Sequence, residues 1–345
     1  MTLKKTAGQI SPSSIIRLAT VSSFVVPSVI FHQLVVKAAE SPTDSQMVTI
    51  QFEGAVGDEP FACGETYQLG TPQSAVTPLD FRFYVSEVAL IDAEGNEVPL
   101  VLEQDNLWQH QNVALIDFED KTGACANGTP QTRGQVVGAV PPGEYNGLKF
   151  TLGVPFSLNH IDSTLAPSPL NLTSMWWNWN FGYKFARFDF ETVNEAIGMS
   201  ASDNLVNVAG AAIDSTANKH TASGSADDAD ATQAFSIHLG SVGCQMDSAQ
   251  PPVSCSVPNR SEIVLTDFDP TTDVVVTDLS TLLADTNLSE NQEGTAVGCM
   301  SSPTDSDCSG IMQNFGLPFG ELPATEQTVF RIEQSLTPEQ PSTSE

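Results

Sequence analysis

The sequence predicts an all-β protein, either an antiparallel β-sandwich or a flattened barrel, with long loops and disulfide staples. Apolar residues alternate with a period of two in most of the patterned segments, which is typical of half-buried strands. We find no long amphipathic helix. The 345 residues are 40% hydrophobic, which is enough apolar material for a large core. These observations favour one sheet-based domain.

Eight segments carry the alternating pattern and are expected to be strands: 48–52, 81–91, 113–118, 147–154, 183–190, 234–240, 262–268 and 328–334. The stretches "AEGNE" (93–97) and "PPGEYNG" (141–147) contain the glycine, proline and asparagine that turns require. A short helix is expected within 278–288.

The N-terminal residues 1–39 have the pattern of a secretory signal peptide. Lysine and arginine precede an apolar stretch at 18–36, and the small residues Ala38 and Ala39 offer a cleavage site. The stretch is barely long enough to span a bilayer, so an uncleaved anchor is the alternative. We find no later segment with eighteen uninterrupted apolar residues. We therefore expect an exported chain with no membrane span after cleavage.

The remaining chain has no internal repeat and no linker that divides it cleanly. We expect a single β domain over residues 40–335. The segment 336–345 is polar and contains proline, and we expect it to be a disordered tail. The alanine-, serine- and aspartate-rich stretch 199–232 is expected to be an excursion from the sheets.

Cysteine usage agrees with export. The six cysteines form an even set with no CxxC pair, which favours disulfides over zinc. Their short spacings suggest two local staples and leave one long-range pair, although spacing alone leaves the connectivity open: Cys244 with Cys255, Cys299 with Cys308, and Cys63 with Cys125. We find no CxxCH motif, so we expect no c-type haem of its own.

The charge is strongly acidic. The chain has 42 Asp and Glu against 13 Lys and Arg, a formal net charge of −29. Such a surface repels nucleic acids and anionic membranes. It is either a solvated surface without a specific partner or a surface that attracts cations or a basic partner.

The stretch "SMWWNWNFGYKF" (174–185) contains three of the four tryptophans. In one continuous strand, residues 177, 179, 181, 183 and 185 would share a face and form an aromatic stripe. Such a stripe is either the core face of a strand or part of a chemical site. Trp176 interrupts the alternation.

Two of the histidines flank this stretch. His160 lies in "PFSLNHID", and His238 lies within the expected strand "FSIHLG". Imidazole is the commonest metal ligand and suits copper and zinc. The alternative is that both are core histidines without a metal.

Several segments together resemble one known family. They include "FRFYVSEVALIDAEG", "LGVPFSLNHID…APSPLNLTSMWWNWNFGYKFARFDF", "FSIHLGSVGC…PVSC…PNRSEIVLTDFDP" and "GCMSSPTDSDCSGI". Taken in order from about residue 47 to 317, they are similar to the MbnP-like family. These are the exported members of metallo-mystery pairs, also described by a four-cysteine motif.

This resemblance implies a specific function. Family members are encoded beside a MauG-like di-haem cytochrome c peroxidase, which oxidises one of their tryptophans to kynurenine. Related proteins bind copper through two histidines and the kynurenine. Carried over to this sequence, the ligands are His160 and His238. Trp177 and Trp179 are equal candidates for oxidation, and Trp176 ranks behind them.

We therefore expect an exported copper-binding protein of a Gram-negative bacterium, located in the periplasm or on the outer surface. It would bind copper after tryptophan oxidation, for copper acquisition or homeostasis, and would not itself be an enzyme. A hydrolase or oxidase is disfavoured because we find no GxSxG or HExxH motif. The remaining alternative is a structural or adhesive β domain with an aromatic core and no metal.

Overall fold

The computed structural model describes residues 44–178, 180–193, 233–247 and 250–335. The expected signal peptide, the 199–232 excursion, the C-terminal tail 336–345 and Trp179 lie outside these residues. None of the helices within the described ranges combines the length and apolar character that crossing a bilayer demands.

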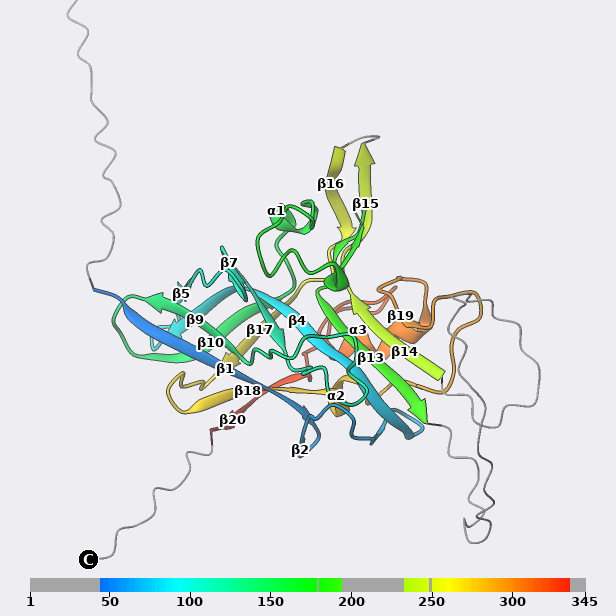
Figure 1. Cartoon of the computed structure of the whole chain (residues 1–345). Helices are drawn as coiled ribbons and strands as arrows, with labels where there is room; N and C mark the ends of the chain where they lie inside the picture. Colours follow the sequence, from blue (N-terminus) through cyan, green and yellow to red (C-terminus); the bar gives the residue numbers. More distant parts are fainter. Residues whose placement is uncertain (1–43, 179, 194–232, 248–249, 336–345) are drawn as a thin grey trace, which may run out of the picture. The chain divides into compact units, whose positions relative to one another are not determined.

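One large sheet has six strands (Figure 1). Along the sheet these are β20 (Phe330–Gln334), β18 (Asp273–Asp278), β1 (Gln46–Val56), β9 (Gln135–Val140) and β6 (Val101–Leu102), and β2 (Glu59–Pro60) pairs with β1. The β1–β18 pair is parallel, and the other pairs in this sheet are antiparallel.

The second sheet has ten strands and carries the candidate site. Its path runs through β17 (Ser261–Thr266), β10 (Tyr145–Leu152), β4 (Ser74–Asp92), β13 (Ala186–Val193), β14 (Gln233–Leu239) and β19 (Gly298–Cys299). Around β4 it also includes β3 (Tyr67–Leu69), β5 (Glu97–Pro99), β8 (Val113–Asp117) and β7 (Gln109–His110). The 19-residue β4 pairs with β13 over its first half and with β10 over its second.

Phenylalanine rings from both sheets form the core between them. Phe52 of β1 lies 6.2 Å from Phe83 of β4 and 5.6 Å from Phe150 of β10, measured between ring centroids. Phe330 of β20 lies 5.2 Å from Phe150. Because these rings join strands of different sheets, the predicted β-sandwich is confirmed.

Each of the eight predicted strand segments overlaps a strand of the structure. The alternation did not reveal β18, because all six of its residues are buried and its sequence therefore has no period of two. The helix expected within 278–288 is much shorter: α2 covers only Leu279–Leu282. The chain then turns, and the carbonyl oxygen of Thr286 accepts a hydrogen bond from the backbone N–H of Thr71.

Two small two-stranded ribbons lie apart from the large sheets. The first pairs β11 (Trp176–Asn178) with β12 (Gly182–Tyr183), and the second pairs β15 (Val242–Asp247) with β16 (Gln250–Val257). Figure 1 shows the second ribbon projecting beside the short helix α1 (Phe156–Asn159). The remaining helical turns are η1 (Thr173–Met175), η2 (Ser306–Cys308) and α3 (Ser309–Asn314).

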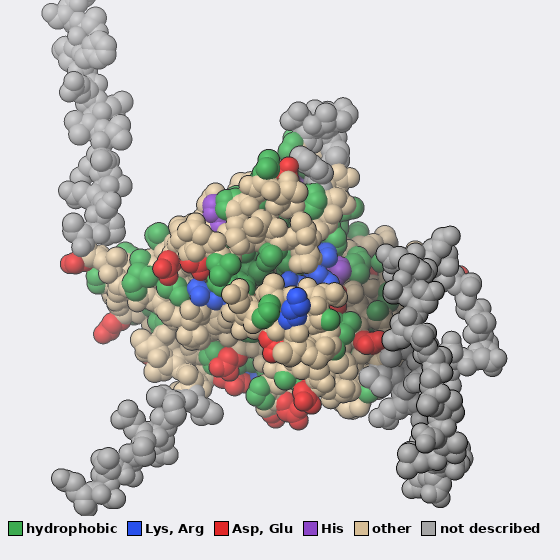
Figure 2. All heavy atoms as spheres, viewed as in Figure 1, with side chains coloured by type: hydrophobic (Ala, Val, Ile, Leu, Met, Phe, Trp, Pro, Cys, Tyr) green, Lys and Arg blue, Asp and Glu red, His purple; other side chains and the backbone are tan. Residues whose placement is uncertain are grey.

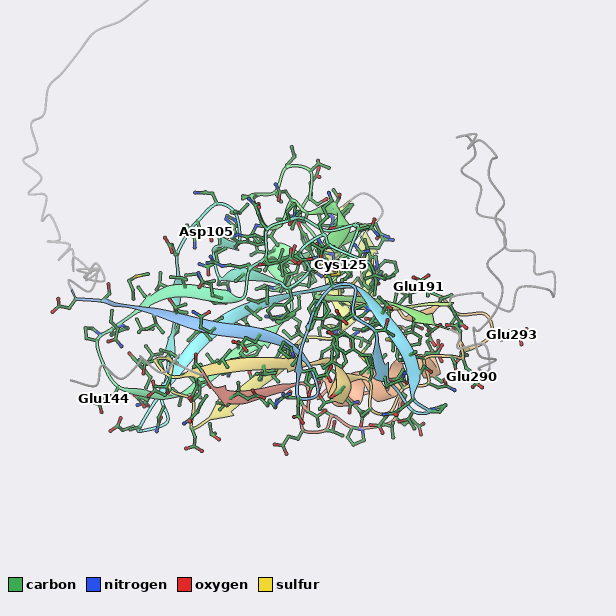
Figure 3. All side chains as sticks on the ribbon, turned by 60° about the horizontal axis from the view of Figure 1, so that its bottom comes forward. Asp105, Cys125, Glu144, Glu191, Glu290 and Glu293 are labelled. Carbon is green, nitrogen blue, oxygen red and sulfur yellow. A yellow bond between two sulfur atoms is a disulfide. The ribbon has the colours of Figure 1, made fainter. Side chains whose placement is uncertain are left out.

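The expected cysteine pairing is confirmed. The disulfides join Cys63 to Cys125, Cys244 to Cys255 and Cys299 to Cys308. Cys125 is fully buried, whereas exposed acidic side chains such as Glu144, Glu290 and Glu293 lie at the periphery (Figure 3).

Candidate functional site

The tryptophan-rich stretch is a hairpin, so the prediction of one continuous aromatic strand was wrong. Trp176 of β11 pairs with Tyr183 of β12. The chain reverses at Asn178, whose side-chain oxygen accepts hydrogen bonds from the backbone N–H groups of Asn180 at 2.9 Å and Phe181 at 3.3 Å. This local turn competes successfully with an extended strand. The next strand of the large sheet, β13, begins only after the hairpin.

The aromatic residues of the hairpin therefore have different environments. Tyr183 and Phe185 are fully buried in the core, whereas Phe181 is 39% exposed. Trp176 and Trp177 are half-buried. The indole nitrogen of Trp176 is buried and has no hydrogen-bond acceptor among the described residues. The core interpretation thus holds for Tyr183 and Phe185, and Trp176 packs against the edge of the same core, whereas Trp177 is not part of it.

His238 lies against Trp177. The two ring centroids are 6.2 Å apart, and the rings are inclined at 57°. Two residues further along the chain, Gly240 permits this approach, because a Cβ atom at that position would lie 2.5 Å from the Cζ3 atom of Trp177. Phe181 also packs against Trp177, in a T-shaped arrangement with ring centroids 5.9 Å apart.

A carboxylate orients His238. Its Nε2 atom lies 2.8 Å from Oδ1 of Asp189 on the neighbouring strand β13. Burial lowers the pKa of His238 despite this acidic neighbour. Burial alone would raise the pKa of Asp189, but the hydrogen bond from His238 and the charge of Arg187 hold it below its ordinary value. The pair is therefore a neutral imidazole that donates Nε2–H to an ionised carboxylate.

His160 is the C-cap residue that follows helix α1, and it is only 5% exposed. Its Nε2 atom lies 3.2 Å from Nδ2 of Asn159 and 3.5 Å from Sγ of Cys255. The ring of Phe156 packs against it, with centroids 5.1 Å apart. An amide nitrogen only donates, so Nε2 of His160 accepts the bond from Asn159.

His160, Cys244 and Cys255 form a cluster in which one potential ligand atom from each lies within 4.8 Å of the others. The two sulfur atoms are joined in a disulfide. Because metals bind thiolates, this pair does not supply thiolate ligands in the disulfide form. Its role beside His160 is to pack against the imidazole and to fix the base of the β15–β16 ribbon.

The tryptophan hairpin contacts both histidine-bearing segments. On one side, Oδ1 of Asn159 accepts a hydrogen bond from the backbone N–H of Tyr183 at 2.9 Å, and Nδ2 of Asn159 lies 3.4 Å from the carbonyl oxygen of Phe181. On the other side, Trp177 packs against His238. The sequence-predicted residues His160, His238 and Trp177 thus belong to one region built around the hairpin.

Sequence reasoning missed Asp189 and Asn159, which position the two histidines. Asp189 had a detectable signal, because it alternates with phenylalanines in "RFDF" and so lies on the face of the strand opposite the core. Asn159 had no comparable signal, since its role depends on the fold of the hairpin beside it.

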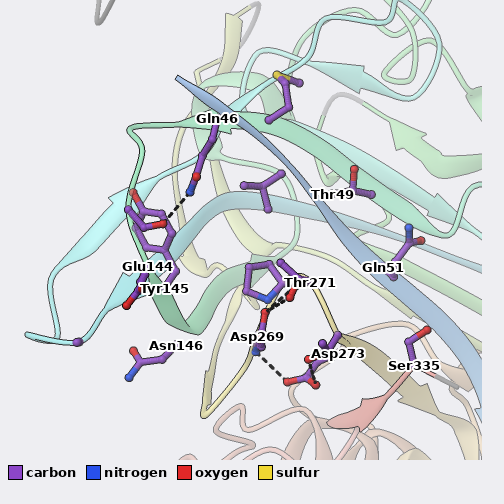
Figure 4. Close-up of a pocket in the computed structure, with 16 residues that line it drawn as sticks. Gln46, Thr49, Gln51, Glu144, Tyr145, Asn146, Asp269, Thr271, Asp273 and Ser335 are labelled. Carbon is purple, nitrogen blue, oxygen red and sulfur yellow. Dashed lines mark hydrogen bonds between the residues drawn. The ribbon is translucent and has the colours of Figure 1, made fainter. Parts of the chain in front are cut away.

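A groove of about 870 Å³ elsewhere on the domain does not contain the candidate residues (Figure 4). It lies between the start of β1 and the loop before β18, and its lining includes Gln46, Tyr145, Asp269 and Asp273. These side chains are engaged with neighbouring loop atoms, as in the bond from Gln46 to the carbonyl of Gly143. We therefore place the candidate site at the hairpin.

Figure 2 shows lysine, arginine and histidine side chains close together near the middle of one face, with acidic side chains mostly toward its edges.

Comparison with known proteins identifies similar molecules at the level of sequence and structure. The MbnP family model matches residues 45–301. The solved structure of MbnP from Methylosinus trichosporium superimposes with a TM-score of 0.66 and 28% sequence identity, and the match covers 85% of this chain and 99% of that one. A search of curated proteins found no match.

Proposed function

This chain belongs to the MbnP family, and on that premise we propose that it is an exported copper-binding protein rather than an enzyme. In this proposal a MauG-like di-haem peroxidase oxidises one tryptophan to kynurenine, and the matured protein takes part in copper acquisition or homeostasis. It acts in the periplasm or at the outer surface. The proposed copper ligands are His160, His238 and the kynurenine.

The packing of Trp177 against His238 carries this proposal. A tryptophan that becomes a ligand must lie beside the other ligands before it is modified. The 6.2 Å separation of the two rings meets that requirement, and the inclined rings leave neither of them stacked over the other. Trp177 is also only half-buried, so an external oxidant can withdraw electrons from its ring at short range.

The residues fit a copper ion. His238 is neutral and uses Nε2 to donate to Asp189, so its Nδ1 atom is the one that would bind a metal. A carboxylate behind a ligating histidine is the usual arrangement around protein metal ions. Nε2 of His160 has one lone pair, which accepts the hydrogen bond from Asn159, so copper binding at this atom would require Asn159 to release that bond. Neutral imidazoles suit copper.

Kynurenine contains an aryl amine and a ketone and would supply the third donor. Bound copper would supply the redox and Lewis-acid chemistry. Other residues of the protein position these donors. Asp189 fixes the imidazole of His238, Asn159 holds His160 against the hairpin, and Gly240 lets Trp177 approach. Trp179 remains an equal candidate for oxidation, and Trp176 ranks behind.

Copper titration of histidine variants tests the ligand assignment. After co-production with the di-haem partner, His160→Ala and His238→Ala should each abolish stoichiometric copper binding, because each removes one of the three proposed donors. His110→Ala is the matched control, since His110 lies on β7 and its imidazole contacts Gln111. Unchanged binding in both site variants would place the metal elsewhere and favour a structural or adhesive domain.

A further inference from the structure

A row of charged side chains crosses four neighbouring strands on one face of the ten-stranded sheet. In register, Asp117 of β8 lies opposite Arg82 of β4, Arg82 opposite Arg187 of β13, and Arg187 opposite His238 of β14. Two residues away on β4 and β13, Asp80 lies opposite Asp189. Because side chains alternate along a strand, the intervening phenylalanines point to the opposite face and into the core.

Four of these side chains form a continuous chain of ion pairs, Arg82, Asp80, Arg187 and Asp189, and Asp189 is hydrogen-bonded to His238 at its end. Arg187 donates from Nε to Oδ2 of Asp189 at 2.7 Å, and Asp189 bonds to His238 through its other oxygen. Nε of Arg187 also lies 3.2 Å from Oδ2 of Asp80. Asp80 in turn forms a bidentate pair with Arg82, and both residues are only 1% exposed.

The same arginines hold the chain immediately before the tryptophans. The carbonyl oxygen of Ser174 accepts hydrogen bonds from Nη1 of Arg187 at 3.3 Å and from Nζ of Lys184 at 3.0 Å. The hydroxyl of Ser174 lies 3.3 Å from Nη1 of Arg82. Ser174 is two residues before Trp176, and the intervening Met175 is fully buried, so the entry into the hairpin is fixed at both residues.

Arg187 is the residue at which the two connections meet. Through Asp189 it holds the imidazole of His238, and through Ser174 it holds the strand that carries Trp177. We propose that Arg187 is a positioning residue that sets the distance and orientation between Trp177 and His238. The effect on copper binding rests on the proposed function, in which Trp177 and His238 supply two of the copper donors.

Arginine suits this position because its planar guanidinium presents several donors in fixed directions. One edge binds the carboxylate of Asp189 while Nη1 reaches the carbonyl oxygen of Ser174. A lysine has a single ammonium group on a flexible stem and would hold one partner well at the expense of the other. The Arg187 side chain is 14% exposed, so water competes weakly with these bonds.

Replacement of Arg187 tests the proposal in two independent ways. In the metal-free, unmodified protein, Arg187→Met should shift the indole resonance of Trp177 and the imidazole nitrogen resonances of His238 in NMR spectra, because both rings lose their common anchor. In the matured protein it should weaken copper binding about tenfold, the lower end of the range for outer-shell partners of metal ligands. Arg187→Lys should cause smaller changes in the resonances and in copper affinity than Arg187→Met.

Arg331→Met is the matched control. Arg331 also bridges two carboxylates, Asp278 and Glu333, but on the other sheet. It should leave the Trp177 and His238 resonances and the copper affinity unchanged. If Arg187→Met folds and leaves both resonances at their wild-type positions, the positioning role is wrong. If the resonances shift but wild-type protein never binds copper, the proposed function fails and the positioning role stands.

Discussion

Asp117 is a buried carboxyl at the far end of the charged row from His238. It is 1% exposed and lies near Asp80 and Glu119, with Arg82 as the nearby cation. Burial, reinforced by the two other carboxylates, raises the pKa of Asp117 to about 8. The folded protein therefore keeps this proton at neutral pH, and Asp117 adds no negative charge to the row.

This raised pKa predicts a specific pH dependence. Between about pH 4 and pH 8 the unfolded chain has released the proton of Asp117 while the folded protein retains it, so this group contributes less stability as the pH rises. Asp117→Asn, which mimics the protonated form, should remove that part of the slope. Urea unfolding of wild type and variant between pH 5 and pH 8 measures it. Parallel slopes would show that Asp117 is ionised in the folded state.

At the residue scale, the sequence pointed to the proposed ligands but not to the groups that position them. Histidine is a rare residue with known metal chemistry, but His160 and His238 were selected through the resemblance to the MbnP-like family. Arg187 and Asp189 could be placed on the face of β13 opposite the core by alternation. Their ion pairs could not be predicted, because they depend on the register of β13 with β4 and β14.

At the scale of elements, the site depends on how closely the tryptophan hairpin can approach its neighbours. Gly240 faces Trp177, and a Cβ atom there would lie 2.5 Å from the ring and 2.9 Å from the carbonyl oxygen of Tyr183. Gly182 has a φ of +75°, and a Cβ atom there would lie 2.3 Å from the carbonyl oxygen of Asn159. Each glycine thus permits one of the two contacts that place the hairpin.

Gly240→Ala should move Trp177 away from His238. We expect altered near-UV circular dichroism from the tryptophans and weaker copper binding, with the sandwich intact. Gly143→Ala is the control, because a Cβ atom there meets only ordinary contacts with the ring of Tyr145 at 3.5 Å. Identical spectra for Gly240→Ala and wild type would mean that the hairpin does not depend on this close approach.

Most strands could be predicted because they alternate, but the tryptophan hairpin could not. Its sequence alternates polar and aromatic residues across Asn178, and so it matches the strand pattern as well as any true strand does. The asparagine side chain decides the outcome by capping two backbone N–H groups, which is a local interaction that periodicity does not register.

At the scale of the whole molecule, three disulfides stabilise the sandwich to different extents. Cys63 and Cys125 are 62 residues apart, whereas Cys299 and Cys308 are 9 apart. A longer closed loop restricts the unfolded chain more. The loop-entropy relation gives about 4 kcal/mol for the long loop and about 2.5 kcal/mol for the short one.

Replacing both cysteines of the long pair with alanine should therefore lower the free energy of unfolding more than the same change in the short pair. Guanidinium unfolding at 25 °C measures the two variants side by side. Equal losses, or a larger loss for the short pair, would show that native packing around each disulfide outweighs the loop entropy.

The central claim is that a tryptophan of the stretch 174–185 becomes a copper ligand. Peptide mass mapping of this protein, produced with and without its di-haem partner, tests that claim most directly. The account predicts that the peptide containing "MWWNWN" gains the mass of one dioxygen less one carbon monoxide, with fragmentation placing the change on Trp177 or Trp179. An unchanged peptide mass in the presence of a demonstrably active partner would contradict it.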